Sequence, residues 1–178
     1  MRLLDADNIK YRTAQYDYDE NDLSGVKAAK AIGMPEEQLF KTLVTKGDKT
    51  GPVVFCIPVA EELDLKKAAV VSKNKKIEMA HVKDLLPLTG YIRGGCSPIG
   101  MKKKFPTFID ETAQLFDEIG VSAGARGHQI ILNPYDLANY VDAGFFDLVV
   151  LLKFYINGGF IWSLTSLAVL TVTRLPVI

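Results

Sequence analysis

The sequence has 178 residues, 48% of them hydrophobic, which fits one globular domain and excludes wholesale disorder. Its 21 basic and 21 acidic residues give a formal net charge of zero, so any contact with nucleic acid has to come from a local patch. The two cysteines, Cys56 and Cys96, stand far apart and belong to no Cys/His cluster, so neither a zinc site nor a disulfide scaffold is indicated. We therefore expect no metal and no cofactor.

The first predicted element is a helix over residues 23–32, because Gly33 and then Pro35 form a typical C-terminal signal. Residues 39–46 and 52–59 predict two strands, and the short glycine-bounded turn between them predicts a hairpin. The second strand is apolar on both faces, so we expect it in the middle of a sheet.

Five further elements are predicted along the chain: helices over residues 61–71 and 79–86, short strands over residues 105–109 and 129–132, and a helix from Asn133 to Gly144. Asn133 is a good N-cap, and Pro134 suits the first helical position. Strands and helices alternate irregularly, with hairpin-like spacings. We therefore predict an α+β fold, a mixed and mainly antiparallel sheet with surrounding helices, rather than a doubly wound parallel sheet.

The last 30 residues differ in kind from the rest. Only Lys153 and Arg174 carry charge after residue 149, and residues 154–173 are long enough for a membrane span of about 20 residues. Three explanations fit: a terminal membrane anchor, a segment docked on the domain or on a partner, and an unnatural C-terminus from a shifted reading frame. The N-terminus lacks the features of a signal peptide, so we expect a cytoplasmic protein.

Lys41 is unusual for its place in the first predicted strand. Residues two apart share a face of a strand, so Lys41 lies between Leu39 and Leu43 on its own face. One interpretation is a lysine whose long stem snorkels at a strand end. The other is a cation at the mouth of a pocket, able to bind phosphate or to stabilise developing negative charge, with the Thr42 hydroxyl beside it.

Residues 94–104 form a glycine-rich loop with a cationic end. The loop contains Gly94, Gly95, Ser97, Pro98 and Gly100, and it closes with Lys102, Lys103 and Lys104. Adjacent glycines let backbone approach a ligand closely, and the proline holds Ser97 extended. The loop suits a ligand with a small polar head and a phosphate tail, although a turn followed by a solvated charge run explains it as well.

Residues 122–127 form a second glycine-bearing loop, which carries Arg126. Arginine suits phosphate or carboxylate, but a surface turn is the better explanation of this loop taken alone. His81 and His128 have no neighbouring Asp/His pattern, and we interpret both as structural or solvated. The usual motifs of serine hydrolases, zincins and P-loop NTPases do not occur.

Taken in order, these motifs resemble the YbaK/EbsC family, freestanding relatives of the editing insertion of prolyl-tRNA synthetase described as deacylases of Cys-tRNA(Pro). The resemblance covers about residues 5–149 and rests on residues 40–43, 94–104, 106–110 and 122–127. It implies a sheet partly rolled into a barrel, with the pocket between the lysine strand and the glycine loop. We accordingly divide the chain into an editing domain, residues 1–149, and an atypical apolar tail, residues 150–178.

The resemblance also assigns residues. Lys41 matches the essential lysine of the family and Thr42 its neighbour, while Tyr16 looks like the family tyrosine, with Tyr18 close enough to blur the choice. The remaining matches are Gly94, Gly95, Ser97, Pro98 and Gly100 in the loop that lines the aminoacyl pocket, and Ser122, Gly124 and Arg126 in the second loop. Some members carry an acidic residue where Gln129 stands, so we assign no carboxylate general base.

In similar enzymes the substrate's own cysteine thiol is thought to attack the ester and leave as a thiolactone. The protein then has only to position the ester and stabilise the oxyanion, and we assign that role to Gly95 and its neighbours. Lys41 contacts the adenosine or phosphate end in this hypothesis, and Cys96 is not the nucleophile. Lys102, Lys103 and Lys104 are candidates for tRNA phosphates.

The implied partners are the 3′ acceptor end of an aminoacyl-tRNA and a prolyl-tRNA synthetase, with no DNA, and a membrane only if the tail spans one. Two alternatives stay open. The same scaffold could deacylate another mischarged tRNA such as Ala-tRNA(Pro), which requires an activated water. The chain could also be a non-catalytic module that binds tRNA or a synthetase.

Overall fold

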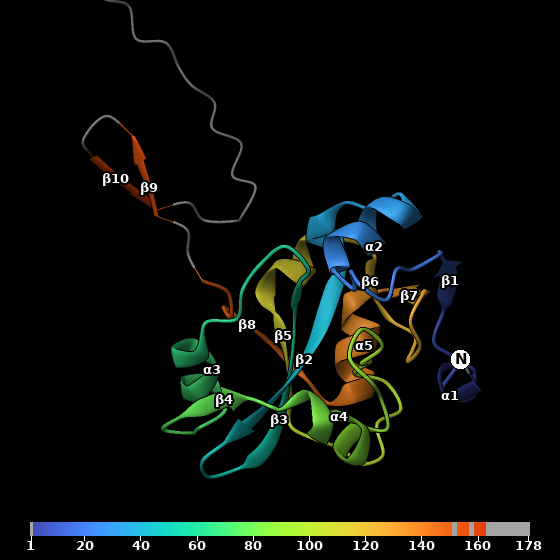
Figure 1. Cartoon of the computed structure of the whole chain (residues 1–178), viewed down its shortest axis with the longest axis horizontal. Helices are drawn as coiled ribbons and strands as arrows, with labels where there is room; N and C mark the ends of the chain where they lie inside the picture. The colour runs from blue at the N-terminus through green and yellow to red at the C-terminus, as the bar shows by residue number, and fades with distance from the viewer. Residues whose placement is uncertain (1, 151–152, 157–158, 163–178) are drawn as a thin grey trace, which may run out of the picture.

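The computed structural model describes residues 2–150, 153–156 and 159–162 (Figure 1). The helices are α1 (Arg2–Ala6), α2 (Gly25–Ile32), α3 (Leu65–Val71), α4 (Val82–Thr89) and α5 (Pro134–Val141), with short 3-10 helices η1 (Glu36–Gln38) and η2 (Glu111–Leu115). The strands are β1 (Tyr11–Gln15), β2 (Phe40–Gly47), β3 (Gly51–Pro58), β4 (Ile77–Met79), β5 (Thr107–Asp110), β6 (Ile119–Ser122), β7 (His128–Leu132), β8 (Gly144–Phe146), β9 (Lys153–Ile156) and β10 (Gly159–Trp162).

Two sheets form the frame of the domain. The larger has the order β4-β2-β3-β5-β8, with antiparallel pairing from β4 to β3 and parallel pairing from β3 to β8. The smaller, β1-β7-β6, is antiparallel throughout. A parallel bridge between Leu39 and Gly120 connects the two sheets where β2 begins. The mixed, mainly antiparallel α+β fold is therefore confirmed, with this bridge as the point where the two sheets meet.

The predicted hairpin and its central strand are both confirmed. β2 and β3 pair from Phe40 opposite Pro58 to Gly47 opposite Gly51. Cys56 on β3 packs in one core cluster with residues of β6, β7 and α5, while Phe55 packs in another with residues of α3. Because β3 is covered on both faces, its residues are apolar throughout and do not alternate between apolar and polar.

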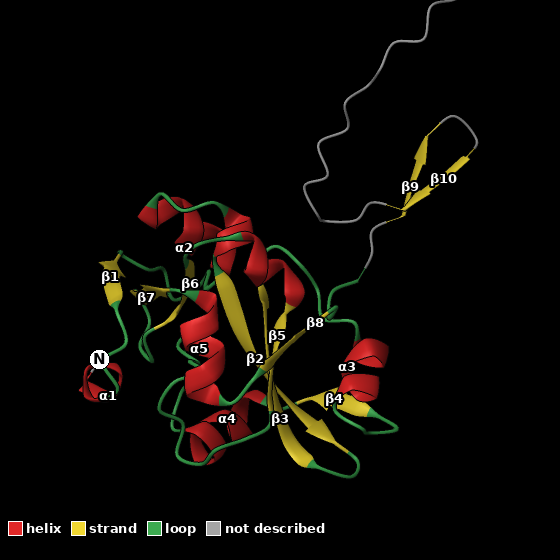
Figure 2. Ribbon diagram, turned by 180° about the vertical axis from the view of Figure 1, so that it is seen from behind, coloured by secondary structure: helices red, strands yellow, loops and turns green. Residues whose placement is uncertain are grey.

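The helices pack their apolar residues against the sheets. α5 lies between the two sheets in Figure 2, with Leu137 in the core that both sheets share. α2 begins after its N-cap, Ser24, and ends at Gly33, whose φ of 68° is the left-handed conformation that glycine adopts most easily. The predicted helix over residues 23–32 is thus confirmed, with a start two residues later.

Three predicted boundaries are wrong. The helix expected over residues 61–71 begins only after Asp64, whose carboxylate accepts hydrogen bonds from the backbone N–H groups of Lys66 and Lys67. The helix expected over residues 79–86 is displaced to α4, because Met79 pairs with Thr45 at the edge of the sheet. α5 ends before Gly144, which belongs to β8. The two short strands expected near residues 105–109 and 129–132 are present as β5 and β7.

The predictions for the tail fall largely outside the described residues. Within it, β9 pairs antiparallel with β10. Val150, the first residue of the tail, donates a backbone hydrogen bond to the Glu62 carbonyl. Among the described residues, no helix combines the length and the apolar character needed to cross a membrane.

Candidate functional site

A cavity of about 440 Å³ opens beside β2, between the start of α2, the end of β6 and the glycine loop. Five residues singled out from the sequence line it: Tyr16, Lys41, Thr42, Gly94 and Ser122. They come from four separate parts of the chain, so the fold brings the lysine strand and parts of both glycine loops to one place.

Lys41 lies half-buried at the wall of this cavity. Its ammonium group donates a hydrogen bond to the carbonyl oxygen of Val59 at 3.1 Å, which fixes the side chain at the point where β3 ends. Burial lowers the pKa of Lys41, and the negative charges of Glu62 and Glu61 oppose that effect. The result is a partly desolvated cation held at a cavity, whose field acts more strongly than it would in open water.

The other polar residues of the cavity wall supply hydroxyls, an amide, the Cys96 thiol and a second cation, the exposed Arg93. Thr42 Oγ1 lies 3.9 Å from Cys56 Sγ, and burial raises the pKa of that thiol to about 12. Ser122 and the largely buried Gln129 lie opposite each other on β6 and β7. Among the described residues that line the cavity, none is a carboxylate or a histidine. The cavity wall therefore supplies no ordinary general base.

Cys96 also lines the cavity, and its chemistry is that of a protonated thiol. Burial raises the pKa of Cys96, and its sulfur lies 3.6 Å from the carbonyl oxygen of Ile92. A thiol is a far weaker nucleophile than a thiolate. This environment agrees with the expectation that Cys96 does not attack the substrate.

Gly94 and Cys96 of the glycine loop line the cavity, whereas Gly95 between them does not. The Gly95 N–H donates to the Ile92 carbonyl at 3.0 Å, and a Cβ on Gly95 would lie 3.4 Å from the Ala125 Cα. Gly94 has a φ of 84°, so it takes the left-handed conformation. Within the described residues, the N–H groups of Gly94 and Cys96 have no hydrogen-bond partner.

Tyr91, which sequence reasoning missed, holds the two glycine loops together. Its hydroxyl donates to the Ile99 carbonyl at 2.6 Å. Its ring lies so close to Gly124 that a Cβ there would come within 2.7 Å of it, and Gly100 has a similarly close approach to the hydroxyl. Both glycines have positive φ, so they serve backbone turns packed on Tyr91 and do not line the cavity. The sequence signal was an aromatic residue three positions before the loop.

Ser97 and Pro98 are buried inside the same loop. The Ser97 hydroxyl accepts a hydrogen bond from the Ile99 N–H at 3.2 Å, so it shapes a turn. Neither residue reaches the cavity. Ser97 and Pro98 therefore support the glycine loop from inside.

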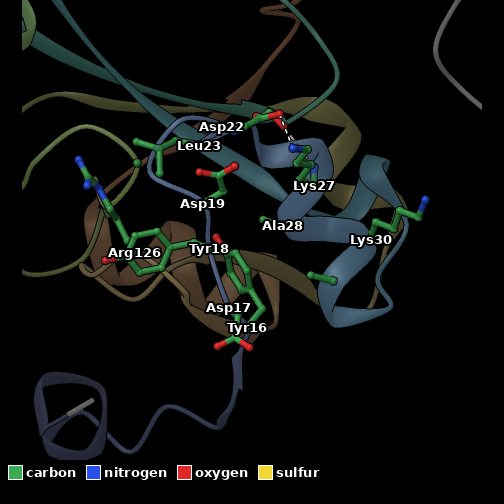
Figure 3. A pocket seen from close by; sticks show the side chains of 13 residues that line it. Tyr16, Asp17, Tyr18, Asp19, Asp22, Leu23, Lys27, Ala28, Lys30 and Arg126 are labelled. Carbon is green, nitrogen blue, oxygen red and sulfur yellow. Dashed lines mark hydrogen bonds and ion pairs between the residues drawn. The ribbon is translucent and has the colours of Figure 1, made fainter.

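Arg126 lies at a second cavity of about 310 Å³, which shares Tyr16 and Gly94 with the first. Figure 3 shows it across that cavity from Lys27, which forms an ion pair with Asp22 at 2.7 Å. Arg126 donates from Nε to the Arg93 carbonyl at 3.0 Å and therefore ties the two loops together.

The second cavity also separates the two candidate tyrosines. Tyr16 lines both cavities, whereas Tyr18 lines only the second and is 44% exposed. Tyr16 is held in place by its backbone N–H, which donates to the Gly127 carbonyl at 2.9 Å. The geometry thus favours Tyr16 as the tyrosine of the site.

The three lysines that close the glycine loop stand apart from the cavities. Lys102 donates to the Leu86 carbonyl at 3.2 Å near the end of α4, while Lys103 and Lys104 are exposed. Across the part of the chain that the structure describes, no group of three or more His, Cys, Asp and Glu side chains is arranged to hold a metal ion.

Comparisons with known proteins point to one family. The family model described as an aminoacyl-tRNA editing domain matches residues 21–140. EbsC of Enterococcus faecalis (strain ATCC 700802 / V583), named as a candidate Cys-tRNA(Pro)/Cys-tRNA(Cys) deacylase, is 49% identical over 148 residues, which are 83% of this chain and 90% of EbsC. A proline–tRNA ligase of Aliarcobacter butzleri (strain RM4018) is 27% identical over 127 residues, 69% of this chain and 22% of the ligase.

A solved structure extends the likeness to three dimensions. It is described as a candidate trans-editing enzyme for prolyl-tRNA synthetase, and it matches with a TM-score of 0.71 and 25% identity over 79% of this chain and 87% of its own. The matched family residues run from before α2 to within α5, so they contain both glycine loops and the lysine strand. The chain therefore belongs to the aminoacyl-tRNA editing domain family.

Proposed function

We propose that this protein is a trans-editing deacylase that cleaves the ester of mischarged Cys-tRNA(Pro), with the cavity beside β2 as its aminoacyl site. The observation that carries the proposal is a cavity with a desolvated lysine and two unpaired backbone N–H groups but no general base among its described lining residues. The 49% identity to a relative named for Cys-tRNA(Pro) and Cys-tRNA(Cys) supports cysteine as the amino acid.

The chemistry suits a substrate that brings its own nucleophile. The cysteine sulfur attacks the ester carbonyl carbon, the bond from that carbon to the ribose oxygen breaks, and the thiol proton passes to the ribose oxygen. The amino acid leaves as a thiolactone, and the tRNA keeps a free 3′ end. The protein has to hold the reacting atoms together and stabilise the transient oxyanion.

The residues divide this work between them. The N–H groups of Gly94 and Cys96 serve as oxyanion donors, in place of the engaged N–H of Gly95. Lys41 holds the adenosine or its phosphate, and Thr42, Tyr16 and Ser122 bound the space for the aminoacyl group. Gly100, Gly124 and Arg126 keep the loops in position from behind.

The partner in this proposal is an aminoacyl-tRNA presented by its acceptor end. The likeness to part of a proline–tRNA ligase supports an association with prolyl-tRNA synthetase, which would supply the substrate before it leaves for the ribosome.

The test compares Cys-, Ala- and Pro-charged tRNA(Pro), incubated with the full chain and with a Lys41→Ala variant. We expect selective loss of Cys-tRNA(Pro), slowed about a hundredfold or more in the variant because the cation that holds the adenosine or its phosphate, and so positions the ester, is gone. Lys66→Ala, an exposed lysine on α3, is the matched control and should behave as the wild type. Release of alanine would instead indicate a water-activating deacylase, and no turnover of any substrate would indicate a binding module.

A further inference from the structure

We propose that a lysine-rich tip at the far end of the β2–β3 hairpin binds phosphates of the tRNA upstream of its acylated 3′ end. This lysine tip consists of Lys46, Lys49, Lys73, Lys75 and Lys76, all of them exposed. The inference rests on the proposed function, because it assigns a second contact to the same substrate. Sequence analysis had placed the candidate phosphate contacts elsewhere, in Lys102, Lys103 and Lys104.

The tip is built from two segments that are far apart in sequence. The hairpin turn after β2 and the loop between α3 and β4 project at the same end of the larger sheet (Figure 1). Asp48 accepts hydrogen bonds from the N–H groups of Lys75 and Lys76, at 2.8 and 3.1 Å. Asn74, buried to 8% exposure, accepts from the Lys49 N–H at 2.9 Å. These bonds fix the backbones that carry the lysines, so the charges are gathered before any ligand arrives.

The charge at the tip is unbalanced. Its five lysines face two carboxylates, Asp48 and Glu78. The Asp48 carboxylate is occupied by backbone N–H groups, and these hydrogen bonds lower its pKa, that from Lys76 most of all. Lys76 forms an ion pair with Glu78. Within the described residues, the other four lysines of the tip form no ion pair, so they are available to a polyanion.

Lys73 has a backbone conformation that is unusual for a lysine. It follows α3 with a φ of 58°, the left-handed conformation that glycine adopts without strain. The Asn74 N–H bonds back to the Ala69 carbonyl at 2.9 Å, which is the helix-ending motif in which glycine usually holds the position of Lys73. A lysine here strains the backbone and places one more cation at the tip.

The position of the tip relative to the cavity favours RNA as the partner. Both lie along β2, and with a rise of about 3.3 Å per residue the Cα atoms of Lys41 and Lys46 are about 17 Å apart. That separation is longer than one nucleotide of a single strand. A tRNA whose acylated 3′ end occupies the cavity can therefore place phosphates of its preceding nucleotides against the tip. Lysines act as mobile point charges, which suits a phosphate backbone read without sequence preference. Because the whole chain has zero net charge, such a patch is what local attraction requires.

The first experiment compares two substrates of different length. Lys49→Ala/Lys75→Ala is measured against wild type and against a Lys10→Ala/Lys66→Ala control, on full Cys-tRNA(Pro) and on a Cys-charged CCA trinucleotide. We expect KM for the full tRNA to rise about tenfold with kcat unchanged, and no change on the trinucleotide. The dependence of log KM on log salt should weaken by about 1.5 units, since each phosphate contact contributes about 0.7 to 0.9. Equal KM values for variant and wild type on full tRNA would overturn the inference.

Direct binding separates this inference from the proposed function. Affinity for uncharged tRNA(Pro) is measured for the same three proteins. If the wild type binds tRNA through the tip but cleaves no ester, the proposed function is wrong and the inference about the tip stands. Unchanged tRNA affinity combined with lost affinity for prolyl-tRNA synthetase would make the tip a protein-docking surface and would overturn its assignment to RNA.

Lys73→Gly tests the lysine that strains the backbone. We expect the melting temperature to rise, because glycine relieves the left-handed strain. We also expect the KM for full tRNA to rise two- to threefold, because a cation is lost. A variant that is more stable and has an unchanged KM would show that the charge of Lys73 contributes nothing to tRNA binding.

Discussion

The cavity lies beside the start of β2 and the lysine tip at its far end, and the two recognise a substrate by opposite means. The cavity works through shape and a few partly desolvated groups, with Lys41 held by the Val59 carbonyl and with Gly94 and Cys96 of the glycine loop in its wall. The tip works through exposed charge on a rigid support, clamped by Asp48 and Asn74. Disturbing the cavity should therefore affect every substrate, whereas disturbing the tip should affect only long ones.

After Lys41→Ala, the largest effect is expected from a change at Gly94, in the wall of the cavity. Gly94→Ala places a Cβ 3.0 Å from Leu23 Cδ1 and forces an alanine into a φ of 84°. Left-handed backbone costs a residue with a Cβ about 1–2 kcal/mol, and relief of that strain would move the N–H groups of the loop. We expect kcat/KM to fall about tenfold or more on full tRNA and on the CCA trinucleotide alike. A fall in kcat/KM on the full tRNA alone would contradict the separate roles of cavity and tip.

The pH dependence of activity should report the environment of Lys41. Burial lowers its pKa in the folded state, so the charged form is lost at a lower pH than for an ordinary lysine. Activity that needs the cation should then fall as pH rises through that lowered pKa. The same shift means that the unfolded chain binds more protons in the window between the folded-state pKa and the ordinary value, so the contribution of Lys41 to stability rises with pH there.

A pH profile of kcat/KM checks this expectation. In Lys41→Arg, a variant that keeps its charge throughout, the alkaline fall should move to higher pH even if the rate at neutral pH is reduced. Identical alkaline limbs for both proteins would show that another group titrates.

A smaller effect is expected from Tyr91→Phe, which removes one hydrogen bond but keeps the ring between the glycine loops. Loss of the bond to the Ile99 carbonyl should cost about 1 kcal/mol of unfolding free energy. Denaturant unfolding measures that change, and both substrates should lose activity by the same small factor. A full loss of activity in a folded variant would mean that the hydroxyl itself takes part in the reaction.

The smallest effect is expected from Cys96→Ser. Its thiol has a raised pKa, and only its backbone N–H is assigned a role. We expect a change in kcat of less than about threefold, measured on Cys-tRNA(Pro) with the fold checked by circular dichroism. A folded but inactive variant would make Cys96 a nucleophile and would contradict its assignment as a residue that acts only through its backbone.

Much of the frame follows from local sequence. The β2–β3 hairpin was predictable because a tight turn separates two apolar runs, and the end of α2 because Gly33 stops it. Met79 was misplaced in a helix because a three-residue edge strand has too few positions to show its period, and its pairing with Thr45 depends on a contact distant in sequence.

The sequence pointed to the segments that form the candidate site, but only some of the residues it singled out line the cavity. Lys41, Thr42 and Gly94 do line one cavity. Sequence spacing could not show that the Gly95 N–H is used in a turn, or that Tyr91 supports both loops, because both facts depend on how segments cross in space. The lysine tip could not be predicted for the same reason, because its lysines lie in two segments that come together only in the folded structure.

The most direct test of the central claim compares Cys-tRNA(Pro) with Ser-tRNA(Pro) on the wild-type protein. Serine has nearly the shape of cysteine, but its hydroxyl ionises far less readily than a thiol, so it fits the cavity without supplying a competent nucleophile. The account predicts rapid release of cysteine, detected first as a thiolactone by mass spectrometry, with Ser-tRNA(Pro) left intact. Release of both amino acids at similar rates would show that the protein activates water and would contradict the account.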